Sequence, residues 1–422
     1  MKFERINSAP NFLRPVQKNS PNNTSQEIKK AAKRSNGIVI SVSHDDYTRV
    51  VGGIQNIIGA EHLEFNKRGI TYIHLCPELA LRGLSKITKS ADFKFSIRLD
   101  GRPLLSINGQ ELQNTLKQLQ AQSKTPLWVF HHLMGHSPEV LQELLSHGTK
   151  KPLLWIHDYF AACSSFTLMR NDAAYCDAPP PQSTTCSSCK YGSNRQEHIT
   201  RMRRFIEQTQ PIITAPSQFA LKQWSKVTGI SPVDSVVIPP VRLTLEPVSR
   251  PEPSRTLRIA YIGRQDKHKG WDIYYQLAEA FRRDNRYKFF QFGKAPKGIF
   301  RQFNTTVRNV SVAVSARNRD AMVEALTRHK IDAVVCWSLW PETFNITVHE
   351  AMASGAFIIA RRQQGNVWPV VSHHAPLASR ALDSEGDLHA YFQAGQLHTD
   401  LLKSPCYRGK TIPSTGSVEV LT

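Results

Sequence analysis

The sequence predicts an α/β fold of two successive domains, each with a parallel sheet covered by helices on both faces. Short apolar runs rich in β-branched residues alternate with helical patterns in both halves, and a proline-rich stretch separates the halves. A chain of 422 residues, 40% of them hydrophobic, is long enough to fill two cores. We therefore expect two Rossmann-like domains whose sheets face each other across a cleft, with ligands beyond the carboxyl ends of the strands.

The first domain is expected over residues 37–242. Its strand-like runs lie at 37–43, 70–75, 126–132, 152–158, 212–217 and 235–240. Residues 243–254, LTLEPVSRPEPS, are rich in proline and are interpreted as a linker.

The second domain is expected over residues 255–385. Its strand-like runs lie at 257–263, 287–293, 331–337 and 356–360, and helical patterns lie at 270–284, 321–329 and 344–354. Gly355 is placed to end the last of these helices. Residues 386–422 carry little signal, and their role is left open.

The N-terminal segment and the net charge give expectations about order, partners and location. Residues 1–36 hold eight Lys or Arg against two Asp or Glu and show no hydrophobic periodicity, which predicts a disordered basic tail. The whole chain has a formal net charge of +20, so an anionic partner is expected. No run approaches the ~20 apolar residues that span a bilayer, and no secretory signal is seen. We expect a cytoplasmic protein.

Two motifs of the second domain are typical of a nucleotide-sugar site. GRQDKHKG follows the strand at 257–262, and its Gly263, Arg264 and Lys269 suit a tight turn with two cations for a diphosphate. PETFNITVHEAMASG places Glu342 before a helix start, a natural anion site, and Glu350 within that helix. Eight residues of helix span ~12 Å, too far for a glycosidase carboxylate pair. The two acids should bond separate hydroxyls of one ligand.

These motifs, GR-x4-KG and E-x7-E in this order, resemble those of the retaining glycosyltransferases of family 4, which have the GT-B fold. The resemblance covers roughly residues 38–385. It implies that Arg264 and Lys269 hold the donor diphosphate, that Glu350 bonds the ribose, and that Glu342 faces the transferred sugar. It also implies that the backbone N–H groups of Phe344, Asn345 and Ile346 bind phosphate and sugar.

The activity implied is transfer of a sugar from a nucleotide-diphosphate sugar to a glycan or lipid-linked saccharide acceptor. Cations and helix-end N–H groups can stabilise charge on the leaving diphosphate, so no catalytic metal is expected. The resemblance places the protein in cell-envelope polysaccharide or lipopolysaccharide synthesis. An epimerase or an inverting transferase fits the E-x7-E pattern less well.

In the first domain, VGGIQ (51–55) resembles the glycine loop of the same family, in which Gly53 would let the backbone approach the ligand. The resemblance also places His157 of WIHDYF (155–160), at the end of a strand, beside the reacting sugar as a catalytic residue. His132 and His136 have the spacing of a metal pair but no obvious third ligand, so His132 is interpreted as lining the cleft.

An insert at 161–192 contains four of the seven cysteines, Cys163, Cys176, Cys186 and Cys189, the last two as C-x2-C. Thiols in such a polar, proline-containing loop suit a structural zinc ion, although the first spacing is irregular; incidental or redox-active thiols are the alternative. The following segment, 195–205, alternates basic and apolar residues. It is interpreted as an amphipathic helix, either resting on an anionic membrane surface or simply solvated.

Two other classes of protein remain as alternatives. A basic zinc-containing nucleic-acid-binding protein would explain the charge and the cysteines, but the chain lacks stacking aromatics among its basic residues and a known finger spacing. No nucleic-acid partner is therefore expected. A catalytically inactive glycan-binding protein with the GT-B fold would not need the intact donor motifs.

Overall fold

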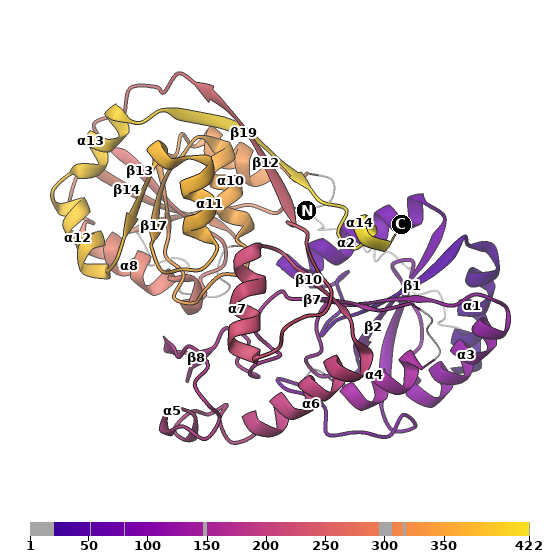
Figure 1. Ribbon diagram of the computed structural model, residues 1–422. Helices are drawn as coiled ribbons and strands as arrows, with labels where there is room; N and C mark the ends of the chain where they lie inside the picture. The colour runs from indigo at the N-terminus through magenta and orange to yellow at the C-terminus, as the bar shows by residue number, and fades with distance from the viewer. Residues whose placement is uncertain are drawn as a thin grey trace, which may run out of the picture.

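The computed structural model describes residues 21–50, 52–79, 81–146, 150–294, 306–314 and 318–421. Two α/β domains lie side by side, the first at the right of Figure 1 and the second at its upper left. Each is built on its own central sheet. This confirms the predicted fold class, although the first sheet is not wholly parallel.

The first sheet has the strand order β11-β10-β7-β6-β1-β2-β3-β4, with β5 beside β3. The strands are β1 (Gly37–Val42), β2 (Ile70–Pro77), β3 (Lys94–Leu99), β4 (Arg102–Pro103), β5 (Ile107–Asn108), β6 (Leu127–Phe130), β7 (Leu153–Trp155), β10 (Ile212–Ala215) and β11 (Ser235–Val237). The six strands expected from the sequence are all present and parallel, whereas β3 runs antiparallel to β2. Its alternation of apolar and polar residues, KFSIRL, was not recognised as a strand.

Helices cover both faces of this sheet. They are α1 (Pro21–Arg34), α2 (Gly53–Lys67), α3 (Gly109–Ala121), α4 (Pro138–Leu145), α6 (Arg195–Thr209) and α7 (Gln218–Thr228). Side chains of α1, α3, α4, α6 and α7 share one core cluster, and those of α2 belong to another. The cysteine insert adds the short elements β8 (Met169–Arg170), β9 (Ala174–Tyr175) and α5 (Thr184–Ser187).

The second sheet is parallel throughout, in the order β15-β14-β13-β16-β17-β18. Its strands are β13 (Leu257–Ile262), β14 (Tyr287–Gly293), β15 (Val307–Ser311), β16 (Ala333–Cys336), β17 (Phe357–Arg361) and β18 (Ser379–Leu382). The helices are α8 (Trp271–Ala280), α9 (Ala321–Arg328), α10 (Ile346–Ser354), α11 (Val367–His374), α12 (Glu385–Gln393) and α13 (Gln396–Lys403). Side chains of α8, α12 and α13 fill one face and those of α9, α10 and α11 the other.

The predicted linker at 243–254 is wrong for its first half. Residues Val241–Val248 form strand β12, which pairs antiparallel with β19 (Cys406–Pro413) over its whole length. Figure 1 shows this ribbon running along the second domain and back toward the first. The sequence did not reveal it because the partner strand is more than 150 residues away, and pairing over such a distance leaves no local pattern.

Residues 386–422, left open by the sequence, have three structural roles. Helices α12 and α13 complete the second domain, with Phe392 and Leu397 fully buried in its core. Strand β19 then returns to the first domain, where the short helix α14 (Val418–Leu421) lies beside α2. Val418 is buried there. The chain therefore crosses between the domains twice.

The predicted disorder of residues 1–36 is also wrong for the part that the structure describes. Residues 21–34 form α1, which packs on α3 and buries Ile28 and Ala32 to 1% exposure. The pair lies four residues apart, one helical turn, so the lysines around it point outward. Residues 1–20 of the predicted tail lie outside the described residues. Among the described helices, none has the length and apolar character to cross a membrane.

Candidate active site between the domains

The two predicted charges Lys269 and Glu342 lie in contact. Glu342 follows β16 and is buried, and both of its carboxylate oxygens lie 2.7 Å from Nζ of Lys269. Ser338 donates a further hydrogen bond to the same carboxylate. The ammonium group also lies 5.2 Å from the ring of Trp340, which adds a cation–π contact. Two motifs 73 residues apart in the sequence therefore form one site.

The backbone around Glu342 is held by Gly365. Its φ of +73° and its close approach exclude a side chain, because a Cβ would come within 2.3 Å of the backbone nitrogen of Glu342. The N–H of Asn366 also donates to the carbonyl of Glu342 at 2.9 Å. Sequence analysis did not single out Gly365, since one glycine after a strand is an ordinary turn signal.

Arg264 lies in the same strand-end loop but does not join the Lys269–Glu342 pair. Its side chain is 69% exposed, and its guanidinium lies 3.0 Å from the carboxylate of Asp266. Gly263 has a φ of +116°, which a residue with a side chain rarely adopts. The loop thus presents Arg264 to solvent at the carboxyl end of β13.

Helix α10 begins as the sequence predicts. The side chain of Asn345 caps it by accepting a hydrogen bond from the N–H of Val348 at 3.0 Å. The first N–H groups of a helix have no intrahelical partner, so this helix start offers donors to an anion. Phe344 stacks on His349, 4.5 Å between ring centroids, and this contact fixes the turn into the helix.

A cavity of about 480 Å³ lies between the domains. Glu350 and Ile346 of α10 line it from the second domain, and Arg49, Gln55 and other residues of the 47–63 segment line it from the first. Glu350 is buried, and burial, with a smaller contribution from Asp320, raises the pKa of its carboxyl to about 8. The cavity thus combines a carboxylic acid that is neutral at pH 7 with the exposed side chain of Arg49.

Gly53 is the first residue of α2, which borders this cavity. A Cβ at Gly53 would meet no atom within 4 Å, so the position faces open space. No contact in the structure requires glycine there, and the predicted approach of a ligand to its backbone stays a prediction.

The loop that contains Glu342 is docked on the first domain. Thr343 donates a hydrogen bond to the carbonyl of His157 at 2.6 Å, and Tyr159 donates to the carbonyl of Pro341 at 2.9 Å. Ser217 donates to the carbonyl of Thr343 at 2.7 Å. Pro341 and Thr343, on the two sides of Glu342, are thus tied to the segment 157–159, which brings the loop of Glu342 next to His157.

His157 is held in one orientation. Its ring stacks on Trp155 with an angle of 2° between the planes, and its Nε2 lies 3.2 Å from Nδ1 of His131. Burial holds the pKa of His157 well below its usual range, so the imidazole is neutral at pH 7. The side chain is not a cation for the diphosphate; its ring and its carbonyl are what it can offer a ligand.

The other histidines have separate partners. His132 lies 3.0 Å from the carboxylate of Asp158, and His136 lies 2.8 Å from the carbonyl of Ser43. They do not converge on a common point as metal ligands would.

The predicted metal site in the cysteine insert is not formed. Cys163, Cys176, Cys186 and Cys189 do line one small cavity of about 20 Å³. Yet within the described ranges, no group of three or more His, Cys, Asp or Glu side chains is arranged to hold a metal ion. The buried guanidinium of Arg195 lines the same cavity and lies 2.8 Å from Sγ of Cys186. The cysteines are free thiols.

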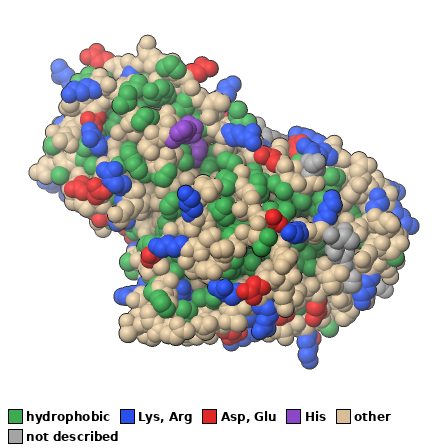
Figure 2. All heavy atoms as spheres, in the orientation of Figure 1, with side chains coloured by type: hydrophobic (Ala, Val, Ile, Leu, Met, Phe, Trp, Pro, Cys, Tyr) green, Lys and Arg blue, Asp and Glu red, His purple; other side chains and the backbone are tan. Residues whose placement is uncertain are grey.

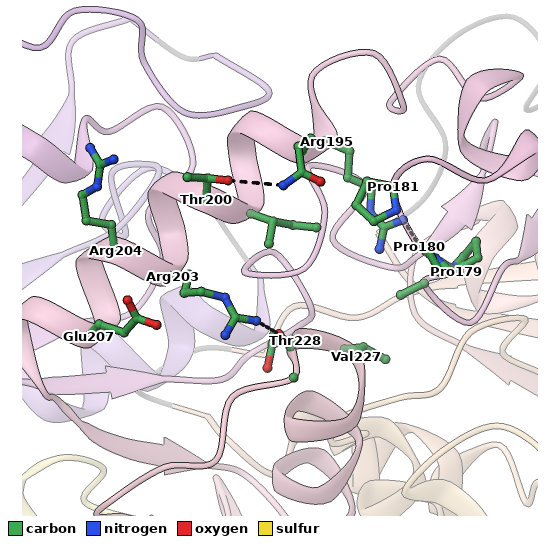
Figure 3. Close-up of a pocket in the computed structure, with 14 residues that line it drawn as sticks. Pro179, Pro180, Pro181, Arg195, Thr200, Arg203, Arg204, Glu207, Val227 and Thr228 are labelled. Atoms are coloured by element: carbon green, nitrogen blue, oxygen red, sulfur yellow. Dashed lines mark hydrogen bonds between the residues drawn. The ribbon is translucent and has the colours of Figure 1, made fainter.

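The membrane interpretation of 195–205 is not supported by the packing of α6. Its apolar residues Met202 and Phe205 are buried in the domain core, so they cannot enter a lipid surface. Arg201 pairs with Glu139, and Arg203 donates to the carbonyl of Thr228 at 2.7 Å. Figure 3 shows Arg203 directed at Thr228, and both residues line an open groove of about 600 Å³ beside α6.

The surface likewise shows no basic stripe on the face seen in Figure 2, where Lys and Arg side chains are scattered over both domains. A nucleic-acid-binding surface would gather them along one track. This face offers no support for that alternative.

Comparisons with known proteins find proteins that are similar to this chain in structure but none that matches it in sequence. No protein-family model and no curated protein sequence matches the chain. Among solved structures, HepE of Anabaena in complex with UDP and glucose is similar, with 11% identity, a TM-score of 0.49, and coverage of 87% of this chain and 92% of that one. A glycosyltransferase from Rickettsia africae has 12% identity, a TM-score of 0.47, and coverage of 87% and 94%.

The catalytic domain of starch synthase IV from Arabidopsis thaliana, bound to ADP and acarbose, has 12% identity, a TM-score of 0.47, and coverage of 87% and 95%. At identities of 11% and 12%, the role of each residue must be decided by the geometry of this chain.

Proposed function

We propose that this protein is a retaining glycosyltransferase that moves a sugar from a nucleotide-diphosphate sugar to a glycan or lipid-linked saccharide acceptor. One observation carries the proposal. The loop that carries the Lys269–Glu342 pair is docked on His157 of the other domain through Thr343, and Glu350 of the adjacent helix α10 lines the cavity between the domains.

The diphosphate would bind where the positive groups lie. Lys269 has three N–H donors, and its two contacts with Glu342 leave one free for a phosphate oxygen. Arg264, exposed on the adjacent loop, can swing from Asp266 to the same group. The N–H groups at the start of α10 add further donors. As the sugar–phosphate bond breaks, these fixed groups stabilise the charge on the leaving diphosphate.

The two acids would hold the rest of the donor. Glu350 lines the cavity as a carboxylic acid that can both donate to and accept from ribose hydroxyls. Glu342, oriented by Lys269 and Ser338, would bond hydroxyls of the transferred sugar. His157 would stand on the opposite side of that sugar, with its carbonyl held by Thr343.

The biological setting is also part of the proposal. The acceptor would be a cell-envelope polysaccharide or lipopolysaccharide precursor, reached in the cytoplasm at the inner face of a membrane. The net charge of +20 supports a role beside an anionic surface. Sedimentation of the protein with phosphatidylglycerol vesicles at low and high salt tests this part by itself.

The donor assignment is tested by thermal shift with nucleoside diphosphates and their common sugar conjugates. One nucleotide should raise the melting temperature of the wild type, and Arg264→Ala and Glu350→Ala should abolish the rise. Arg282→Ala, an exposed arginine of the same domain, is the matched control and should keep it. Donor hydrolysis by the wild type would then separate an enzyme from an inactive glycan-binding protein. A panel that leaves the wild type unmoved refutes the assignment.

A further inference from the structure

A buried chain of hydrogen bonds runs behind His157 and involves residues to which the proposed mechanism gives no role. Nε2 of His157 lies 3.2 Å from Nδ1 of His131, and Nε2 of His131 lies 3.0 Å from a carboxylate oxygen of Glu61. Both Glu61 and His131 are buried, at 0% and 1% exposure. Glu61 lies on α2, so the chain links the helix beside the cavity to the end of β7.

The far end of this chain is fixed by the C-terminal segment. The backbone N–H and the hydroxyl of Ser417 both lie 2.6 Å from the second carboxylate oxygen of Glu61. The same hydroxyl accepts a hydrogen bond from the indole N–H of Trp155 at 2.8 Å. Trp155 is the residue on which the ring of His157 stacks. Both supports of His157, the hydrogen-bonded one and the stacked one, therefore end at Ser417.

The donors and acceptors along the chain determine the tautomer of His157. The backbone N–H and the O–H of Ser417 both donate to one carboxylate oxygen of Glu61, so Glu61 acts there as an acceptor. An ionised Glu61 can only accept from His131, so a neutral His131 ring carries its hydrogen on Nε2 and leaves Nδ1 as an acceptor. His157 fills that acceptor by carrying its own hydrogen on Nε2. The remaining nitrogen of His157, Nδ1, is left as an acceptor.

We propose that Glu61 is a positioning residue that acts through His131 to hold His157 in the Nε2–H tautomer, and that Ser417 keeps Glu61 in place. His157 would then accept a hydrogen bond from a hydroxyl of the bound sugar rather than donate one. This inference rests on the proposed function for its catalytic consequence. The tautomer itself is a property of the ligand-free protein.

The variant Glu61→Gln tests the inference because it keeps the size of the side chain and reverses the direction of the hydrogen bond between residue 61 and His131. The amide oxygen can still accept from Ser417, and the amide N–H₂ then donates to His131. This moves the hydrogen of His131 to Nδ1 and that of His157 to Nδ1 as well. A single change at residue 61 is therefore expected to invert the tautomer of His157, which it reaches through His131.

Two measurements on the full-length protein read this out. ¹⁵N NMR of histidine-labelled protein, with signals assigned by their loss in His157→Phe, should show His157 protonated on Nε2 in the wild type and on Nδ1 in Glu61→Gln. Steady-state kinetics should show kcat reduced about 10- to 100-fold, as for other supporting residues of a site, with the KM for the donor nearly unchanged. Glu64→Gln, on the same helix in surface ion pairs with Lys67 and Arg68, is the control and should change neither.

An Nδ1–H tautomer in the wild type overturns the inference, and so does a kcat of Glu61→Gln equal to that of the wild type. The two proposals fail separately. If Glu61→Gln keeps the nucleotide-induced thermal shift and has normal kcat, the donor site stands and the positioning role falls. If no nucleotide shifts the wild type, the transferase proposal falls while the NMR result still decides the tautomer.

Discussion

The hydroxyl of Thr343 donates a hydrogen bond to the carbonyl of His157 across the domain boundary, at 2.6 Å. Thr343 follows Glu342 directly, so this bond, together with those of Tyr159 and Ser217, holds the acid of the second domain near the histidine of the first. It also occupies the carbonyl of His157, the group that could face positive charge on a reacting sugar. The geometry of the cleft thus depends on a residue that neither motif marks as functional.

Replacing this threonine should loosen the cleft without unfolding the protein. Thr343→Val keeps the shape and loses one hydrogen bond, a net effect of about 1 kcal/mol. We expect kcat/KM for sugar transfer to fall roughly 5-fold, since 1.4 kcal/mol corresponds to a factor of ten. Thr327→Val removes an exposed hydroxyl that bonds to the carbonyl of Val323 within the same helix, and it is the control. Equal losses in both variants would contradict the role of this contact.

Removing Lys269 should destabilise the second domain, because Glu342 is buried and would keep a charge without its cation. Breaking one side of such a pair costs about 3 kcal/mol. Lys269→Met should therefore lower the free energy of unfolding in urea by that order and abolish nucleotide binding.

The double variant Lys269→Met/Glu342→Gln gives the decisive comparison. It removes both charges, so we expect the stability to return to within about 1 kcal/mol of the wild type while transfer stays undetectable. A double variant as unstable as the single one would mean that the ion pair is not what holds Glu342 in the fold.

Glu350 should make stability depend on pH. Its carboxyl pKa is raised by burial from 4.5 to about 8 in the folded state. Between these values the unfolded chain has lost the proton that the folded protein keeps, so stability should fall as pH rises from 4.5 to 8 and then level off. The maximum slope from one such group is about 1.4 kcal/mol per pH unit.

The isosteric variant Glu350→Gln has no carboxyl group to ionise at this position, so it should not lose this stability as the pH rises. In urea unfolding it should be more stable than the wild type at pH 8, and the two should converge near pH 4.5. Glu324→Gln, an exposed glutamate of α9, controls for the general loss of one acid. Parallel stability curves for wild type and Glu350→Gln would contradict the raised pKa.

Helix α1, which forms where the sequence predicts a disordered tail, can be tested by one core substitution. Ile28 is 1% exposed against α3, so Ile28→Ala should lower the free energy of unfolding by about 2–4 kcal/mol. Lys30→Ala, two residues on and exposed, should have an effect below about 0.5 kcal/mol. Unfolding followed by circular dichroism distinguishes the two, and an Ile28→Ala protein as stable as the wild type would return this segment to a disordered tail.

How much of the site could be predicted depends on where its signals lie. Gly263, Lys269, Glu342 and the capped start of α10 each follow a strand of the second sheet, and parallel strands bring such ends to one edge. Their convergence on one site could therefore be expected from the order of strands and helices. The sequence could not predict that Lys269, and not Arg264, pairs with Glu342, because this pairing depends on the burial of the Glu342 carboxylate.

Sequence by itself determined the two α/β domains, the positions of the predicted strands and the donor motifs, because these follow from short-range periodicity and from the chemistry of single loops. Only the tertiary structure decided that β12 pairs with β19, that Ser417 reaches Glu61, and that the four cysteines stand beside Arg195 without metal geometry. Each of these joins residues whose partner is set by the path of the whole chain. Such long-range contacts form only when the whole chain has folded, so they leave no pattern in the neighbouring residues of the sequence.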